Sequence, residues 1–172
     1  MRGFLIGRFQ PFHHGHASVV DQISSEVDEL VIGVGSAGDS HTASDPFTAG
    51  ERIMMITKAL DDSDIPIYVV PIEDLERHSV WVSHVRSMCP QFEVAYSNNP
   101  LVIRLFQEAG VDVRQSPMYD RKKLEGSDIR KRMVNGQQWR DRVPDPVVEV
   151  IEEIDGIQRI RHVSDTDSLN GQ

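Results

Sequence analysis

The sequence predicts an α/β fold, an open parallel sheet with helices on both faces, followed by a small C-terminal helical segment. Short apolar runs recur along the chain and alternate little between polar and apolar residues, as expected of parallel strands that are buried on both faces. Segments with apolar residues at helical spacing lie between these runs. Strand and helix therefore alternate, which favours parallel strands joined by right-handed crossovers.

The clearest candidate strands are residues 3–7, 30–35 and 66–72, and residues 92–96 and 111–114 are weaker candidates. After the first strand, helical spacing is shown by Ala17, Val20, Ile23 and Val27. Thr48 and Glu51 form a capping-box pattern that opens a helix through Leu60, and Asp145-Pro146 opens a late helix. We expect residues 1–161 to form one domain and residues 162–172 to form a polar, flexible tail.

Composition narrows the function classes. The 172 residues include 18 basic and 27 acidic side chains, a formal net charge of -9, whereas a nucleic-acid binder needs a basic face. No apolar stretch approaches the length of about 18 residues that a membrane span requires. The single cysteine permits no internal disulfide, and we expect a cytoplasmic location.

The first chemical motif, residues 7–16 with the sequence GRFQPFHHGH, lies where the first strand ends and the first helix begins. A helix N-terminus offers unpaired N–H groups and positive potential to a phosphate. Gly15 lets the backbone come close to a ligand, and Arg8 adds a fork-shaped cation, suited to phosphate oxygens, beside His13 and His16. The alternatives are a solvated turn or a metal site, although these histidines would make a poor zinc site without further ligands.

The second motif, residues 125–133 with the sequence EGSDIRKRM, lies in the C-terminal third of the chain. We expect Ser127 to cap a helix whose first turn could receive a phosphate, with Arg130 projecting near that end. Taken alone, the segment could equally be a capped basic surface helix. Together with the histidine motif, it predicts the second half of a triphosphate site.

These motifs resemble the HxGH and ISGTxIR-like signatures of the nucleotidylyltransferase superfamily. Residues 40–52, 71–82 and 96–100 extend the likeness, so that the chain from Arg2 to about Arg161 resembles archaeal-type nicotinamide-nucleotide adenylyltransferases. Ser127 stands where these proteins have threonine. Three further departures are Glu125 in place of serine, His78 in place of asparagine and Asn98 in place of glycine.

The resemblance implies a Rossmann-like HxGH fold, transfer of AMP from ATP to nicotinamide mononucleotide (NMN) to give NAD and pyrophosphate, and a homo-oligomer, specifically a hexamer. Mg²⁺ or another divalent cation would accompany ATP. The segment around Trp81 favours a nicotinamide acceptor, because a ring face suits a cationic pyridinium. The alternatives are another phosphorylated acceptor (pantetheine phosphate or FMN) and a non-catalytic nucleotide sensor.

The resemblance also assigns roles to residues. The catalytic set is Arg8, His13, His16 and Arg130. The ATP-binding set is Gly7, Arg8, Phe9, His13, Gly15, His16, Asn99, Ser127, Ile129 and Arg130. The NMN-binding set is Ser36, Arg52, Asp74 and Trp81, with a surface cation as the alternative for Arg52. No residue is assigned as a metal ligand. Because the acceptor phosphate ionises with a pKa of about 6, the reaction needs alignment and charge neutralisation rather than a general base.

Overall fold

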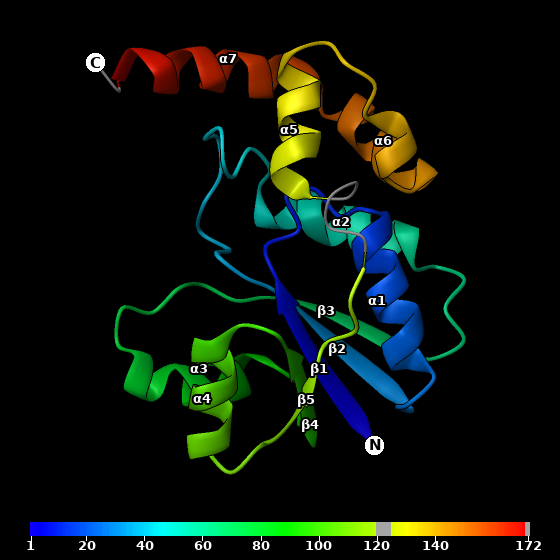
Figure 1. Ribbon diagram of the computed structural model, residues 1–172, viewed down its shortest axis with the longest axis vertical. Coiled ribbons are helices and arrows are strands. Elements are labelled where there is room, and N and C mark those ends of the chain that lie inside the picture. The colour runs from blue at the N-terminus through cyan, green and yellow to red at the C-terminus, as the bar shows by residue number, and fades with distance from the viewer. Residues whose placement is uncertain (120–124, 171–172) are drawn as a thin grey trace.

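The computed structural model describes residues 1–119 and 125–170, and within them the expected α/β architecture is confirmed (Figure 1). The sheet is parallel throughout, with the strand order β3-β2-β1-β4-β5. Its strands are β1 (Arg2–Gly7), β2 (Glu29–Val34), β3 (Ile67–Pro71), β4 (Val94–Ser97) and β5 (Asp112–Gln115). All three clear candidates and both weaker ones are therefore strands of a Rossmann-like sheet.

Helices cover both faces of this sheet. The α-helices are α1 (His14–Ser24), α2 (Ala49–Ala59), α3 (Trp81–Met88), α4 (Pro100–Glu108), α5 (Gly126–Val134), α6 (Asp145–Glu153) and α7 (Gly156–Asn170). Two short 3-10 helices, η1 (His78–Val80) and η2 (Arg140–Arg142), complete the described elements. In Figure 1, α3 and α4 cover one face, α1 and α2 cover the other, and α5 to α7 lie beyond the carboxyl ends of the strands.

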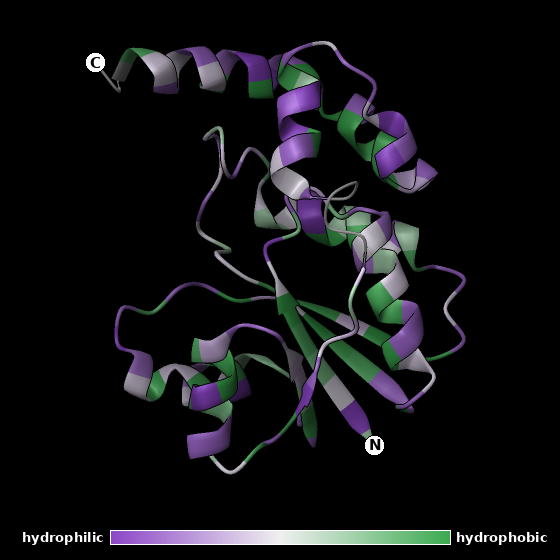
Figure 2. Cartoon of the chain, in the orientation of Figure 1, coloured by the Kyte–Doolittle hydropathy of each residue, from purple (hydrophilic) through white to green (hydrophobic). Residues whose placement is uncertain are grey.

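The two-sided core explains why the strand sequences do not alternate. Leu5 of β1 and Ile32 of β2 belong to the larger cluster, which includes residues of α1, α2 and the C-terminal helices. Phe4 and Val31, their neighbours in the chain, belong to a second cluster with α3 and α4. Both sides of β1 and β2 are thus buried, and these central strands are apolar along much of their length (Figure 2).

Local signals fixed the start of α2. The Thr48 hydroxyl accepts a hydrogen bond from the Glu51 N–H at 3.2 Å, and a Glu51 carboxylate oxygen accepts one from the Thr48 N–H at 2.9 Å. The expected capping box is therefore present. The helix ends at Ala59, one residue before the expected end.

The expected cap of α5 was wrong. The helix begins at Gly126, its N-cap residue is Glu125, and the Glu125 side chain accepts no capping hydrogen bond. Ser127 is the second residue of the helix. Because Gly126 has no side chain, the first turn packs close to Arg130 and the Gln10 carbonyl: an added Cβ would lie 3.0 Å from Arg130 Nη1 and 3.6 Å from Gln10 O.

The boundary expected after Arg161 falls inside α7, which runs without a break to Asn170. The Asp167 carboxylate accepts a hydrogen bond from the Ala43 N–H at 2.8 Å, so this helix contacts the loop between β2 and α2. The described part of the expected tail is therefore helical. Its flexibility, and the limits of the domain at residues 1–161, stay predictions.

Candidate functional site

Three pockets meet beyond the carboxyl ends of β1 and β4. The Trp81 pocket is lined by Arg8, Ser36, Asp74, His78, Trp81 and Asn99 among others. The histidine pocket is lined by Arg8, Phe9, His13, His16, Ser127 and Arg130 among others. The Met118 pocket is lined by Gly7, Phe9, His16, Asn98, Asn99 and Met118 among others. Their volumes of about 430, 460 and 440 Å³ each suit part of a nucleotide.

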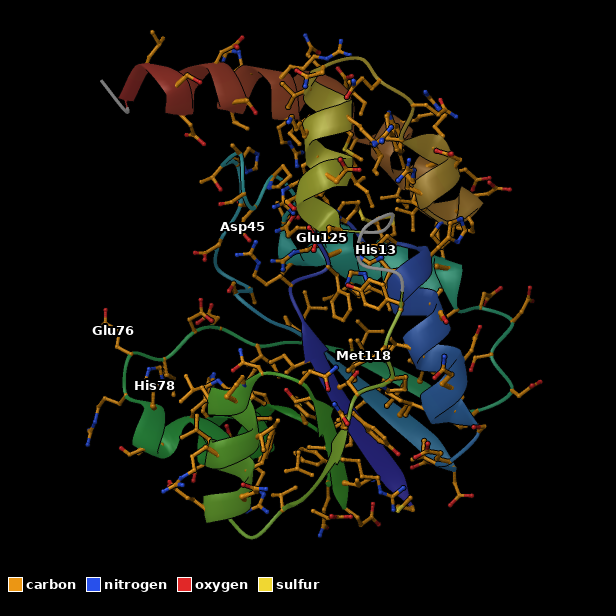
Figure 3. All side chains as sticks on the ribbon, in the orientation of Figure 1. His13, Asp45, Glu76, His78, Met118 and Glu125 are labelled. Carbon is orange, nitrogen blue, oxygen red and sulfur yellow. The ribbon has the colours of Figure 1, made fainter. Side chains whose placement is uncertain are left out.

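The three pockets are neighbours, because each shares lining residues with the other two. Gly7 and Asn99 line both the Trp81 pocket and the Met118 pocket. Arg8 lines the Trp81 and histidine pockets, and His16 lines the histidine and Met118 pockets. In Figure 3, His13 and Glu125 lie just below α5. Met118 lies lower, beside the sheet, and His78 lies at the left, beside α3. Segments far apart in sequence thus build one branched site.

His13 and His16 form the centre of this site. Their rings stack with centroids 3.6 Å apart and an interplanar angle of 18°. The Nδ1 of each ring accepts a hydrogen bond from the backbone N–H of the other residue, at 3.2 Å and 3.3 Å, which makes a capping box at the start of α1. Since Nδ1 accepts, the hydrogen of each neutral ring is on Nε2, and Nε2–H remains available as a donor.

Both rings are neutral near neutral pH. Burial, followed by the nearby His14, lowers the pKa of His13 from 6.5 to about 4. Burial, followed by the His13 ring, lowers the pKa of His16 well below its ordinary value. The pair can therefore donate two hydrogen bonds to an anion without carrying charge before the anion binds.

Gly15 is required by the packing of the same rings. An added Cβ at this position would overlap the ring of Tyr119 and lie 2.9 Å from Cε1 of His13. The Tyr119 ring lies edge-to-face with His13, with centroids 5.5 Å apart. In the structure, an aromatic side chain packs closely against Gly15, and the close approach of a ligand to this backbone stays a prediction.

Two guanidinium groups supply positive charge to the histidine pocket. Arg8 is half exposed, and its Nε lies 3.5 Å from the buried Asp45 carboxylate. Arg130 donates a hydrogen bond from Nη1 to the Gln10 carbonyl at 2.9 Å, which joins the two predicted motifs. Burial, followed by the charge of Arg8, lowers the pKa of Arg130. Ile129, which the ATP-binding set included, is fully buried in the core and lines none of the three pockets.

The Trp81 pocket brings together three residues that the sequence placed in one set. Trp81 begins α3, is half-buried and packs edge-on against Phe106, with ring centroids 5.4 Å apart. Ser36 reaches the pocket from the end of β2, and Asp74 reaches it from the loop after β3. His78, one of the departures from the family pattern, also lines this pocket.

Arg52, the fourth member of that set, does not line the pocket. Its side chain has no exposed surface, and its guanidinium donates to backbone carbonyls, including those of Arg8 and Gly35 at 2.8 Å each. This burial contradicts the alternative, a surface cation, while a role of Arg52 in NMN binding stays a prediction. Hydrogen bonding to the ends of two strands holds this side chain inside the protein.

Sequence reasoning missed several residues. The Gln10 side-chain amide donates to the Phe47 carbonyl at 2.9 Å and accepts from the Phe47 N–H at 3.0 Å. The position of Gln10 inside the first motif was a signal that could have identified it. Met118 and Tyr119 follow β5 in a segment without periodicity, so no signal marked them. Asn98 donates from Nδ2 to the Ser116 carbonyl at 3.0 Å and lines the Met118 pocket.

Across residues 1–119 and 125–170, no cluster of three or more His, Cys, Asp and Glu side chains is arranged to hold a metal ion. Glu125 is the one carboxylate among the described lining of the histidine pocket. Within the described part of the chain, no helix has the length and apolar character needed to cross a membrane.

Residues 4–132 match the family model described as cytidylyltransferase-like. A nicotinamide-nucleotide adenylyltransferase of Haloarcula marismortui is 71% identical over 98% of this chain and 90% of its own length. Proteins of the same name from Halobacterium salinarum and Methanosarcina barkeri are 70% and 58% identical. Each of these two matches covers 97% of this chain, and the shares of the relatives covered are 94% and 96%.

Solved structures show the same fold at lower identity. A bifunctional NMN adenylyltransferase/ADP ribose pyrophosphatase from Francisella tularensis, complexed with AMP and an Mn ion, superposes with a TM-score of 0.79 at 21% identity. The match covers 94% of this chain and 52% of that one, so the chain spans about half the length of this structural neighbour. A NadR protein in complex with NAD and AMP-PNP gives a TM-score of 0.58 at 16% identity, covering 78% of this chain and 42% of its own.

Proposed function

The chain belongs to the cytidylyltransferase-like family, as a nicotinamide-nucleotide adenylyltransferase that makes NAD from ATP and NMN, and from this premise we propose how its pockets divide the two substrates. The triphosphate of ATP binds in the histidine pocket and the adenosine in the Met118 pocket. NMN binds in the Trp81 pocket, with its phosphate toward Arg8. The three pockets share lining residues, which supports placing the acceptor phosphate next to the α-phosphate.

One observation carries this assignment. The histidine pair at the start of α1 and the Ser127–Arg130 turn of α5 line the same pocket, although more than a hundred residues separate them in the chain. Both are helix starts, which attract anions. A site with two helix starts, two guanidinium groups and two neutral imidazole donors is built for a polyanion.

The proposed chemistry needs no base. An oxygen of the ionised NMN phosphate attacks the α-phosphorus of ATP in line, the bond from that phosphorus to the bridging oxygen breaks, and pyrophosphate leaves with its electron pair. The Nε2–H groups of His13 and His16 donate to phosphate oxygens as charge develops. Arg8 and Arg130 hold the triphosphate and offset its charge, so that positioning and electrostatics lower the barrier.

Nicotinamide recognition rests on Trp81 and Asp74. An aromatic face attracts a cationic pyridinium ring, and a carboxylate in the same pocket adds to that attraction. This combination favours NMN over pantetheine phosphate, which has no cationic ring. Ser36 lines the pocket beside Arg8 and would contact the ribose phosphate.

A divalent cation, with Mg²⁺ as the proposed ion, fits this site with few protein ligands. Glu125 is one carboxylate near the triphosphate, and two guanidinium groups alone do not neutralise that anion. A bound cation would supply charge neutralisation between phosphate oxygens, which are the ligands that Mg²⁺ prefers. Glu125 would hold it directly or through water.

The direct experiment mixes the purified protein with ATP, Mg²⁺ and NMN, and measures both NAD and pyrophosphate. We expect equal amounts of the two products, and we expect His16→Ala to lose activity while the matched variant His14→Ala keeps it. His14 is exposed and is not among the residues that line the histidine pocket. Pyrophosphate release only with pantetheine phosphate or FMN would reassign the acceptor, and ATP binding without turnover would favour a nucleotide sensor.

We also propose that the protein works as a homo-oligomer, specifically a hexamer, in the cytoplasm and without nucleic acid. The family resemblance supports the hexamer, and the net charge of -9 opposes binding to nucleic acid. Light scattering of the purified chain measures the oligomer directly, and a monomer would contradict the proposal.

A further inference from the structure

All three nitrogens of the Arg52 guanidinium donate hydrogen bonds to backbone carbonyls next to the site. It donates from Nε to the carbonyl of Thr48 at 3.2 Å, from Nη1 to those of Arg8 and Gly35 at 2.8 Å each, and from Nη2 to those of Ser36 at 3.1 Å and Asp39 at 3.5 Å. A guanidinium has five N–H donors, so every one is occupied. No ligand can compete for them, because the side chain has no exposed surface.

Two of these carbonyls belong to peptides at the ends of neighbouring strands. Arg8 follows β1 and Gly35 follows β2. In a trans peptide the C=O and the following N–H point in opposite directions, and the cis bond found in the described residues is Gln10-Pro11. The hold on these carbonyls therefore directs the N–H groups of Phe9 and Ser36 away from Arg52.

Within the described residues, those two N–H groups make no hydrogen bond. Neither Phe9 nor Ser36 donates its backbone N–H to another residue of the described ranges, 1–119 and 125–170. Phe9 lines the histidine and Met118 pockets, and Ser36 lines the Trp81 pocket. The free donors thus belong to residues that line the site.

The backbone at both residues is in a conformation that needs support. Phe9 has φ of 53° and Ser36 has φ of 48°, in the left-handed region that residues other than glycine seldom adopt. Successive N–H groups around such a residue form a concave site that binds anions. The Arg52 guanidinium donates to the carbonyls of Arg8 and Gly35, the residues that precede Phe9 and Ser36. These hydrogen bonds hold the peptide groups next to the two strained residues.

We propose that Arg52 is a positioning residue for the phosphate of the acceptor, and that it acts by turning the N–H groups of Phe9 and Ser36 toward that phosphate. The inference rests on the proposed function, because it places the NMN phosphate between the ends of β1 and β2. Burial lowers the pKa of Arg52, and Asp45 offsets part of this effect without a hydrogen bond to the guanidinium. The Arg52 guanidinium therefore also places a buried positive charge near the proposed position of the phosphate.

The test compares two ligands that differ by the phosphate alone. Binding of NMN and of nicotinamide riboside to the folded protein is measured by calorimetry, with Arg52→Lys as the variant. Lysine keeps the charge and loses the planar fork. We expect the affinity for NMN to fall about tenfold or more, the range for losing charge-assisted hydrogen bonds, while that for the riboside stays within about twofold.

Arg159→Lys is the matched control. Arg159 also donates to a backbone carbonyl, that of Pro46 at 3.2 Å, and to Glu51 of the same helix as Arg52, but it lines none of the three pockets. This variant should leave the ratio of the two affinities unchanged. An equal loss of NMN and riboside binding in Arg52→Lys, or no loss of either, would refute the positioning role.

A second route applies if Arg52→Lys does not fold. Ser36→Val disfavours positive φ, whereas Ser36→Gly removes the same hydroxyl and adopts positive φ readily. We expect the glycine variant to bind NMN about tenfold more tightly than the valine variant, on the same hydrogen-bond scale, with similar riboside binding in both. Equal NMN binding by the two variants would overturn the inference. Failure of the unmodified protein to bind NMN would instead refute the proposed function.

Discussion

Replacing His13 by asparagine should remove part of the acid sensitivity of the fold. Burial, and then the neighbouring His14, lowers the pKa of His13 from 6.5 to about 4 in the folded protein, while the unfolded chain keeps the ordinary value. Between these two values, the unfolded chain binds a proton that the folded protein does not. Stability is therefore fully present above pH 6.5 and is lost as the pH falls toward about 4.

The size of the effect follows from the two pKa values. A tenfold difference in proton affinity corresponds to about 1.4 kcal/mol, so the fall in pKa from 6.5 to about 4 corresponds to about 3 kcal/mol lost between neutral pH and pH 4. His16 adds a loss in the same direction, because its folded-state pKa is also lowered. Asparagine is a good helix N-cap, so His13→Asn keeps an acceptor for the His16 N–H.

Urea denaturation at a series of pH values measures this directly. The quantity of interest is the difference in the free energy of unfolding between the unmodified protein and His13→Asn, since the many carboxylates titrate in both and cancel. We expect this difference to change by about 3 kcal/mol in favour of the variant as the pH falls from neutral to about 4. The exposed His14→Asn serves as the control and should retain the steep acid loss of the unmodified protein.

A constant difference between the two proteins across that range would refute the reasoning. It would mean that the His13 ring titrates alike in the folded and unfolded states. The assignment of Nε2–H as a neutral donor to phosphate would then fail as well, because it depends on a ring that is uncharged before the substrate binds.

Three further predictions concern catalysis and binding. His16→Ala should lower kcat by about 10²-fold or more, the scale for losing one transition-state donor, with the fold checked by circular dichroism; near-normal turnover would reject the assigned role. Trp81→Ala should raise KM for NMN by about tenfold through loss of the stacking face, and Trp81→Phe should recover most of that loss. If Trp81→Ala raised KM for ATP equally, Trp81 would be a packing residue. Gly15→Ala should push the Tyr119 ring off His13 and raise KM for ATP, and the added change Tyr119→Ala should restore part of the affinity. Simple additivity of the two changes would argue against contact between them.

Features that depend on neighbours in the chain were predictable from the sequence. The capping box of Thr48 and Glu51 lies within four residues, and the structure has both of its hydrogen bonds. The histidine motif was equally local, because its glycine and imidazoles share one helix start. The pairing of this motif with the Ser127–Arg130 turn needed the family resemblance, since nothing in the spacing places the two segments together.

Features that depend on tertiary packing were not predictable. Arg52 lies on a helix after a capping box, and this local position gave no sign that its side chain would bond two other segments, the one after β1 and the one after β2. The buried place of Ile129 and the contact of Tyr119 with Gly15 arise in the same way. The hydrogen bond from Arg130 of α5 to Gln10 of the distant first motif is likewise a tertiary contact.

Gly7, Ser97 and Asn99 form a strip that lines both the Trp81 pocket and the Met118 pocket. NAD would straddle this strip as one tethered molecule with a base in each pocket. An end that detaches is kept close by the other, at an effective concentration in the millimolar range that is typical of short linkers. Pyrophosphate has no such tether. We therefore expect it to depart first, and NAD to dissociate last and to be the stronger product inhibitor.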